Sequence, residues 1–188
     1  NGLCMGLAIH MPNGLVEGNV VSNIGYPGLQ VSTMLRWTRW TIGHVPTNII
    51  VRGNTLANVN RDVHTPADLF TAAGIEPQGK DFELSRQPVL ENILIEGNVI
   101  RESPLQALVI GSSKNVIVRN NVFIGPNRQP DRAGYSGAMM VKNSHDVVVD
   151  GNRLEIPGNR SGSGSMVIDQ GSTQNILIGK NPGFEAAR

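Results

Sequence analysis

The sequence predicts an all-β solenoid, in which short strands wind around one axis in about six coils of three strands each. A short apolar run that ends in asparagine recurs six times along the 188 residues. Each copy is accompanied by short segments rich in Val and Ile, separated by Gly, Asn or Ser and too short for helices. The 22 glycines and the low share of charged residues, 16%, suit a chain built on tight turns.

The copies of the repeat predict the second strand of each coil. They are Leu15–Asn19, Ile49–Asn54, Ile93–Asn98, Val116–Asn121, Val147–Asn152 and Ile176–Asn181. Self-similarity at this scale is the signature of a solenoid. Because a solenoid stacks equivalent positions in a line, residues far apart in the sequence can be placed a known number of coils apart.

Apolar triplets before each repeat predict the first strands. They are Leu7–Ile9, Leu29–Val31, Ala73–Ile75, Leu108–Ile110, Met139–Val141 and Met166–Ile168. The third strand follows the repeated asparagine, as Leu154–Ile156 does in the fifth coil. Each coil thus has three strands and three corners.

The repeated asparagine marks the corner between the second and third strands. Asn, like Gly, adopts the left-handed backbone region at low cost. Its amide can also bond the same residue one coil above and below, which satisfies polar groups in a buried corner. We therefore expect a structural ladder rather than a ligand site, made of Asn19, Asn54, Asn98, Asn121, Asn152 and Asn181.

The spacing of these asparagines indicates the class of solenoid. Successive intervals are 35, 44, 23, 31 and 29 residues, and the shortest holds three strands and three turns only. A left-handed hexapeptide helix would show a strict short period, and leucine-rich repeats would show a regular Leu grid. The pattern resembles the right-handed parallel β-helix of the pectate-lyase-like superfamily over essentially the whole chain. The resemblance implies one β-helix domain over 1–188 and an extracellular or periplasmic location.

Composition and termini restrict the partners. A net charge of +1 gives no general attraction to nucleic acid or to an anionic membrane. No apolar run approaches the length of a membrane span, and the single cysteine, Cys4, cannot form an internal disulfide.

No amphipathic helix caps the open strand edges. We expect a fragment of a longer chain, with further coils or a partner chain covering the ends; a terminus shielded by its own loop is the alternative.

Insertions gather beside the first strands and predict a groove along that face. Relative to a 23-residue coil, the surplus lies at 33–47, 60–71, 77–90, 125–136 and 157–163. Long loops on a rigid scaffold are where binding and catalysis usually occur.

The side chains of these loops suit a carbohydrate. Aromatic faces stack on sugar rings, and Arg binds carboxylate or hydroxyl pairs. The predicted substrate-binding residues are Trp37, Trp40, Arg36, Arg39, Tyr135 and Arg132. The alternative for Trp37 and Trp40 is a small core of the loop itself, with Arg stacked on the rings.

The position after each first strand predicts the floor of the groove, and it holds His10, Ser32, Glu76, Gly111, Lys142 and Asp169. Coils lie about 4.8 Å apart, so Glu76 and Lys142 would be about 10 Å apart. Glycosidase carboxylates lie about 5–5.5 Å apart in retaining enzymes and about 6.5–9.5 Å apart in inverting ones. The two floor acids, Glu76 and Asp169, would be three coils or about 14 Å apart and do not meet this spacing. A hydrolase would therefore need an acid from a loop, such as Asp131.

The candidate catalytic residues are Glu76, His10, Lys142, Asp169, His64 and Asp131. His64 follows Asp62, which could orient it as a base, although a hydrogen-bonded loop histidine is the competing interpretation. A lyase would need a base and a positive group near the enolate. No cofactor is expected, and no cluster of aspartates supports a calcium site. We expect a polysaccharide hydrolase or lyase; the alternative is a non-catalytic glycan-binding or structural β-helix, such as an adhesin or a tailspike-like stalk.

Overall fold

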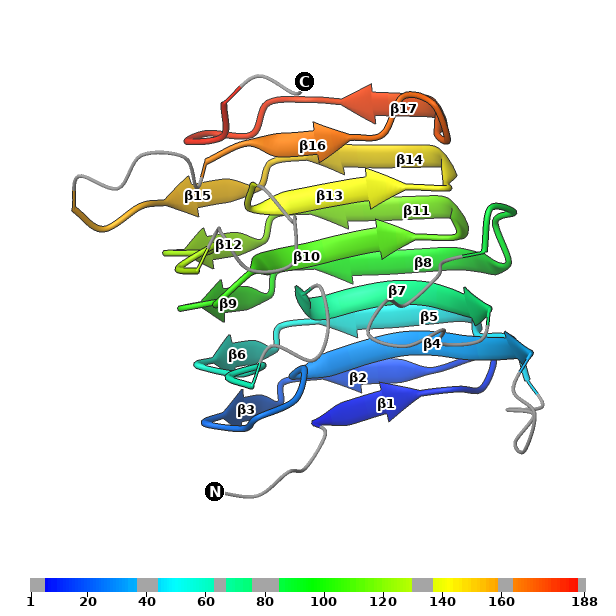
Figure 1. Cartoon of the computed structure of the whole chain (residues 1–188), viewed down its shortest axis with the longest axis horizontal. Coiled ribbons are helices and arrows are strands. Elements are labelled where there is room, and N and C mark those ends of the chain that lie inside the picture. Colours follow the sequence, from blue (N-terminus) through cyan, green and yellow to red (C-terminus); the bar gives the residue numbers. More distant parts are fainter. Residues whose placement is uncertain are drawn as a thin grey trace.

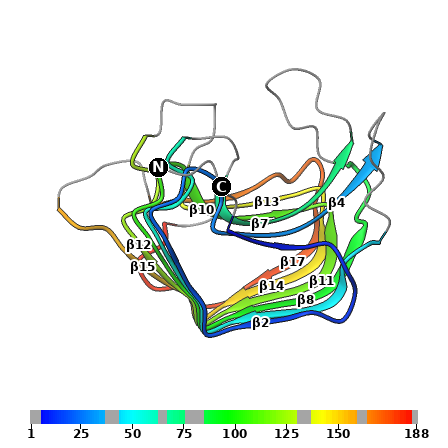
Figure 2. The same ribbon diagram turned by 90° about the horizontal axis from the view of Figure 1, so that it is seen from below.

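The chain winds as a right-handed parallel β-helix (Figures 1 and 2). The computed structural model describes residues 6–36, 44–62, 67–75, 85–129, 137–158 and 164–185. Within them, 17 strands form three parallel sheets that enclose one core, and no helix is present. The predicted solenoid of about six coils is confirmed.

Sheet A contains the first strand of each coil. Its strands, in spatial order, are β1 (Leu7–Ile9), β4 (Leu29–Arg36), β7 (Ala67–Ile75), β10 (Gln106–Gly111), β13 (Met139–Lys142) and β16 (Met166–Ile168).

Sheet B contains the second strands, which include the repeated apolar runs. They are β2 (Leu15–Glu17), β5 (Thr47–Arg52), β8 (Leu90–Glu96), β11 (Ser113–Arg119), β14 (His145–Asp150) and β17 (Gln174–Ile178). Alternate residues of these strands point into the core, where Val51, Ile95, Val118 and Val149 stack and are fully buried.

Sheet C contains the third strands of the first five coils. They are β3 (Val20–Ser22), β6 (Thr55–Ala57), β9 (Val99–Arg101), β12 (Val122–Ile124) and β15 (Arg153–Glu155). In the sixth coil, Phe184 takes part in the core instead, with its ring edge against Phe123 at 5.7 Å between centroids.

The predicted asparagine ladder is present at the corner between sheets B and C. The Oδ1 atom of Asn121 accepts bonds from both the backbone N–H and the side-chain amide of Asn98, each at 2.9 Å. Asn121 in turn donates to Oδ1 of Asn152 and to the carbonyl of Ile95. Because every link repeats this pattern, the amides of Asn54, Asn98, Asn121 and Asn152 are buried with their hydrogen bonds satisfied.

The prediction that the ladder asparagines adopt the left-handed backbone region is wrong. The residue in the left-handed region is the one before the ladder position. It is Gly18, Gly53, Gly97, Asn120 or Gly151, with φ between 56° and 67°. The ladder asparagine is retained for its amide, whereas the sharp turn depends on its neighbour.

A second asparagine column lies at the corner between sheets A and B. Its members, each six residues before a ladder asparagine, all have φ between 52° and 59°; they are Asn13, Asn48, Asn92, Asn115, Asp146 and Asn175. The side chains of Asn13, Asn48, Asn92 and Asn115 are linked in sequence at about 3.0 Å, and Asn175 is linked to Asp146 at 3.0 Å. This column was not predicted, although its constant spacing of six residues from the ladder is visible in the sequence.

The predicted first strand of the third coil, Ala73–Ile75, lies within β7, but its predicted register is wrong. Strand β7 begins at Ala67, and its register pairs Leu69 with Leu29 and Ala72 with Ser32. The pairing triplet is therefore Leu69–Thr71, four residues before the predicted Ala73–Ile75. This displacement changes which residue belongs to the groove floor.

Candidate functional site

The outer face of sheet A is covered at its centre. Gln30, Phe70, Val109 and Met140 stand side by side on adjacent strands. Phe70 is 4% exposed and Val109 is 2% exposed, and together with Met140 they form a small apolar cluster. The middle of this face is therefore not an open floor, and the polar pockets formed by described residues lie at the two ends of its strands.

The column after the first strands holds His10, Ser32, Ala72, Gly111, Lys142 and Asp169. Glu76 was expected in this column, but the register gives its place to Ala72. The prediction failed because β7 starts six residues earlier than expected.

His10 lies at the far end of the column from the other ionisable residues. Its Nδ1 bonds the carbonyl oxygen of Ser32 at 2.7 Å, which requires that Nδ1 carry the proton. Four coils separate His10 from Lys142, a distance of about 19 Å at about 4.8 Å per coil. His10 therefore links coils one and two and cannot act with Lys142 on one bond.

Lys142 and Asp169 come together at the carboxyl ends of β13 and β16. The Lys142 Nζ lies 3.9 Å from Oδ2 of Asp169. The other oxygen of Asp169 accepts the N–H of Gly171 at 3.2 Å, and the Asp169 carbonyl accepts Thr173 Oγ1 at 2.6 Å. Asp169 thus organises the turn into β17 while it presents its carboxylate to Lys142.

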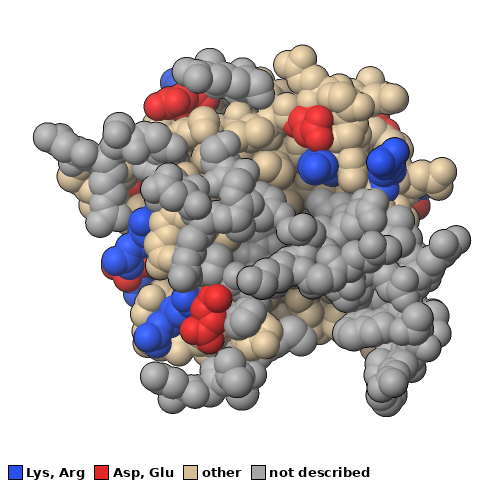
Figure 3. Space-filling model, viewed as in Figure 1, with Lys and Arg blue, Asp and Glu red and all other residues tan. Residues whose placement is uncertain are grey.

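These residues line a polar pocket of about 640 Å³. Its other walls are Arg86 and Asn143 and the turn Gln170–Gln174. In Figure 3, basic and acidic side chains gather on the upper right of the face, toward the side to which the arrows of β13 and β16 point in Figure 1. Two cationic side chains, one carboxylate and the hydroxyls and amides of the turn converge here, a set that can bind carboxylate and hydroxyl groups together.

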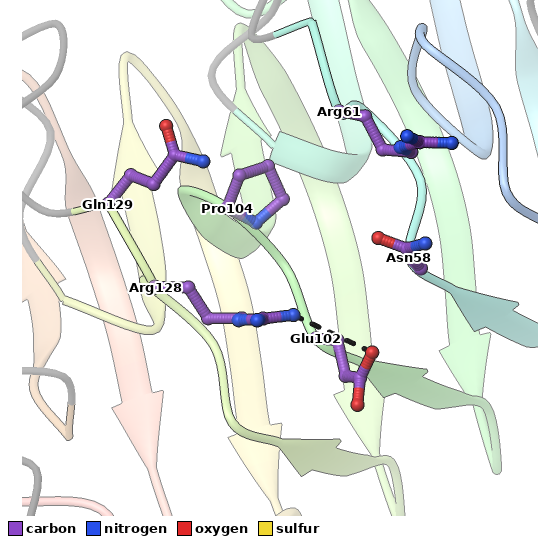
Figure 4. A pocket seen from close by; sticks show the side chains of 6 residues that line it. All are labelled: Asn58, Arg61, Glu102, Pro104, Arg128 and Gln129. Carbon is purple, nitrogen blue, oxygen red and sulfur yellow. Dashed lines mark ion pairs between the residues drawn. The ribbon is translucent and has the colours of Figure 1, made fainter. Parts of the chain in front are cut away.

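A second polar pocket, of about 300 Å³, lies near the amino ends of the sheet A strands (Figure 4). Its lining residues are Asn58, Arg61, Glu102, Pro104, Arg128 and Gln129. The Arg128 guanidinium lies 3.6 Å from the Glu102 carboxylate, so part of its charge is already compensated. This pocket was not predicted, although the pairs Asn60-Arg61 and Asn127-Arg128 recur at equivalent corners.

A buried carboxylate lies close to this second pocket. Asp68 is fully buried in β7, and no described residue forms a geometrically good hydrogen bond with its oxygens. Desolvation raises the pKa of Asp68 well above its usual value, and the nearby Ser103 hydroxyl offsets only part of this shift. Burial therefore favours the uncharged form of Asp68 more than it is favoured in an exposed carboxyl group.

Most of the other predicted site residues lie outside the described residues. This holds for Glu76, His64 and Asp131 among the catalytic candidates, and for Trp37, Trp40, Arg39, Arg132 and Tyr135 among the binding candidates. The backbone of Arg36 ends β4, and its side chain is not described.

The described part of the chain contains neither a cluster of metal ligands nor a membrane-spanning helix. No three His, Cys, Asp or Glu side chains there are grouped so that they could hold a metal ion. That part also contains no helix of the length and apolarity needed to cross a membrane.

Comparison with known proteins adds no closer assignment. No protein-family model matches the chain, and no curated protein matches it. The fold therefore defines the molecule as a parallel β-helix protein. The features of the described residues that bear on its function are the two polar pockets.

Proposed function

We propose that this β-helix protein is carbohydrate-active and binds an acidic polysaccharide at the pocket formed by Arg86, Lys142 and Asp169. The convergence of these three charged side chains beside a turn rich in polar groups supports the proposal. Guanidinium and ammonium groups recognise a sugar carboxylate, and a carboxylate accepts bonds from sugar hydroxyls. The pocket volume falls in the range of small-molecule sites.

Eliminative cleavage is the second candidate, because Lys142 and Arg86 line one pocket. A lyase removes the proton next to the uronate carboxylate and stabilises the resulting enolate with positive charge. Hydrolysis by two carboxyl groups fits this pocket less well, since Asp169 is the one acid among its described lining residues. Glu76 and Asp131 remain candidates for the partner acid of a hydrolase.

Binding and cleavage can be separated with a panel of uronic-acid, sulfated and neutral polysaccharides. We expect retention on the acidic polymers in affinity electrophoresis and weaker retention for Lys142→Met and Arg86→Ala. The matched control is Lys114→Met, because Lys114 is also ion-paired and half-buried but lies on sheet B. Equal losses in Lys142→Met and Lys114→Met, or no retention by the unaltered protein, would contradict the proposed site.

Absorbance of unsaturated products and assays of new reducing ends test the reaction on the same polymers. Unsaturated products that disappear in Lys142→Met support the lyase. Reducing ends without unsaturation indicate a hydrolase and would overturn the lyase candidate. Retention with neither product identifies a binding module.

We also propose that further coils or a partner chain cover the two ends of the solenoid. Val16 and Ile176 are partly exposed, whereas the equivalent inward positions of the middle coils are fully buried. Open strand edges with exposed core residues recruit additional strands.

A further inference from the structure

The outer face of sheet B carries an exposed aliphatic column. Leu15, Ile50, Leu94, Ile117, Val148 and Leu177 are in register on its six adjacent strands. Leu15 is 57% exposed, Ile117 40% and Leu177 64%. In Figure 2, sheet B forms one side of the cross-section, and no described segment lies over its outer face.

Polar columns border the aliphatic column on both sides. On one side lies the second asparagine column, and its members Asn48, Asn92 and Asn115 join the aliphatic side chains in lining a shallow hollow. On the other side lies a column of charged residues whose sign alternates from coil to coil. It reads Glu17, Arg52, Glu96, Arg119 and Asp150.

Neighbouring residues of this column form ion pairs within one chain, and their side chains remain partly exposed to solvent. Arg52 bonds Glu17 at 2.8 Å, and Arg119 bonds Glu96 at 3.0 Å. The two arginine side chains remain about half exposed. The carboxylate of Glu17, with a smaller contribution from Glu96, raises the pKa of Arg52, so its guanidinium stays charged at any physiological pH.

This pattern is complementary to itself when the order of the coils is reversed. A two-fold axis parallel to the strands, placed between the third and fourth coils, brings each column onto the same column of a second copy. Glu96 then faces Arg119 of the second copy, and Arg52 faces its Asp150. Along the aliphatic column, Leu94 meets Ile117, Ile50 meets Val148, and Leu15 meets Leu177.

We propose that a second copy of this chain docks on the outer face of sheet B in this antiparallel arrangement. A two-fold axis parallel to the solenoid would instead set the charged column against the asparagine column, and the alternation of sign would have no counterpart. A single charged peptide would match only part of a column in which the sign changes at every coil. The site lies on a different sheet from the glycan pocket, so this proposal stands independently of that one.

The size of the face indicates the strength of the association. Six strands at about 4.8 Å, each contributing about five residues of about 3.3 Å, give on the order of 500 Å² per copy. The total of about 1,000 Å² is at the lower limit of specific interfaces. We therefore expect a reversible dimer whose population rises with protein concentration and falls with salt.

Sedimentation equilibrium over a concentration series tests the dimer. We expect Ile117→Lys to sediment as a monomer, because it puts a charge at the centre of the aliphatic column. Its matched control is Val20→Lys, since Val20 is 77% exposed on sheet C and should leave the dimer intact. Circular dichroism verifies that both variants fold. An unaltered protein that is monomeric at every concentration, or a mass above that of a dimer, would overturn the proposal.

Disulfide trapping tests the register. In a Cys4→Ser background, chains carrying Leu94→Cys are mixed with chains carrying Ile117→Cys and oxidised. The antiparallel arrangement predicts mixed dimers in excess over like pairs. A predominance of Leu94→Cys pairs with each other would show that equal coils face each other and would exclude the proposed axis.

Discussion

At the scale of single residues, two columns of asparagine perform different tasks in the same coils. The ladder members of the middle coils are buried and exchange amide bonds with the neighbouring coils and with core carbonyls. The members of the second column are exposed, adopt the left-handed backbone and bond mainly to one another. Because buried polar groups cost more to leave unpaired, the first column should dominate stability.

Replacement of Asn121 by Ala should lower the free energy of unfolding by about 1–3 kcal/mol, because it strands the donors of Asn98 and the acceptor of Asn152. Chemical denaturation at equilibrium measures this loss. Asn115→Gly is the control, because it removes one exposed bond and keeps the left-handed backbone available. An equal loss in both variants would contradict a special role for the buried ladder.

The buried Asp68 predicts a dependence of stability on pH. Its folded pKa is raised, so the folded chain holds a proton that the unfolded chain releases above the ordinary carboxyl pKa of about 3.8. Stability contributed by Asp68 is therefore greatest in acid and declines as the pH rises toward the folded pKa. Asp68→Asn should remove this decline and raise the melting temperature at neutral pH.

Thermal melts of both proteins between about pH 4 and about pH 7 measure this difference. Asp169→Asn is the comparison, because Asp169 is partly exposed and ion-paired. A lower melting temperature of Asp68→Asn at neutral pH would show that the charged carboxylate stabilises the fold.

The sequence predicted residues of the scaffold better than residues of the site. The ladder repeats six times, so each copy confirms the others. Glu76 was assigned from one triplet, and an error in one strand was enough to displace it from the column. Lys142 and Asp169 were placed in adjacent coils correctly, because β13 and β16 are short and their ends are unambiguous.

At the scale of elements, β7 shows why pattern alone misplaced a strand. It spans nine residues and offers two apolar segments, Leu69–Phe70 and Ala72–Ile75. The predicted triplet Ala73–Ile75 was taken from the second of these segments. Register is fixed by the neighbours: Leu29 and Leu108 both pair with Leu69 and select the first segment.

Strand β14 begins with a break in the second asparagine column. The Asp146 side chain accepts a bond from Asn175 at 3.0 Å, but its carboxylate has no N–H to donate to Asn115 in the preceding coil. The bonds from Asn175 and then from His145 lower the pKa of Asp146 below its ordinary value. Its contribution to stability is thus complete above about pH 3.8 and is lost as the pH falls through the lower folded pKa.

Asp146→Asn should make the melting temperature less sensitive to pH in this acidic range, because the amide does not titrate and supplies the missing donor. Melts recorded between about pH 2 and about pH 5 measure the slope. Asn175→Gly should also flatten the slope, since it removes the bond that favours the ionised carboxylate. An unchanged slope in both variants would show that the acid response arises elsewhere.

At the scale of the whole molecule, stability should decrease from the middle coils toward both ends. Each coil contacts only its neighbours, so a terminal coil has half of the stacking contacts. Val51, Ile95, Val118 and Val149 are fully buried, whereas Ile178 of the last coil is 39% exposed.

Hydrogen exchange should therefore be slowest in β8 and β11 and fastest in β2 and β17. Mass spectrometry of proteolytic peptides measures this profile in dilute protein, where the proposed dimer dissociates. Uniform protection from β2 to β17 would indicate that the six coils unfold as one unit.

Because the two asparagine columns are always six residues apart, a whole coil can be deleted or duplicated without disturbing either column. Residues Asn98 to Asn120 span one full turn of 23 residues, and the amide columns would rejoin across their removal or duplication. Tandem copying of such a segment lengthens the rod without redesigning its core. In the longer intervals the surplus lies in the strands of sheet A and beside them, so the number of coils and the length of the loops can change independently.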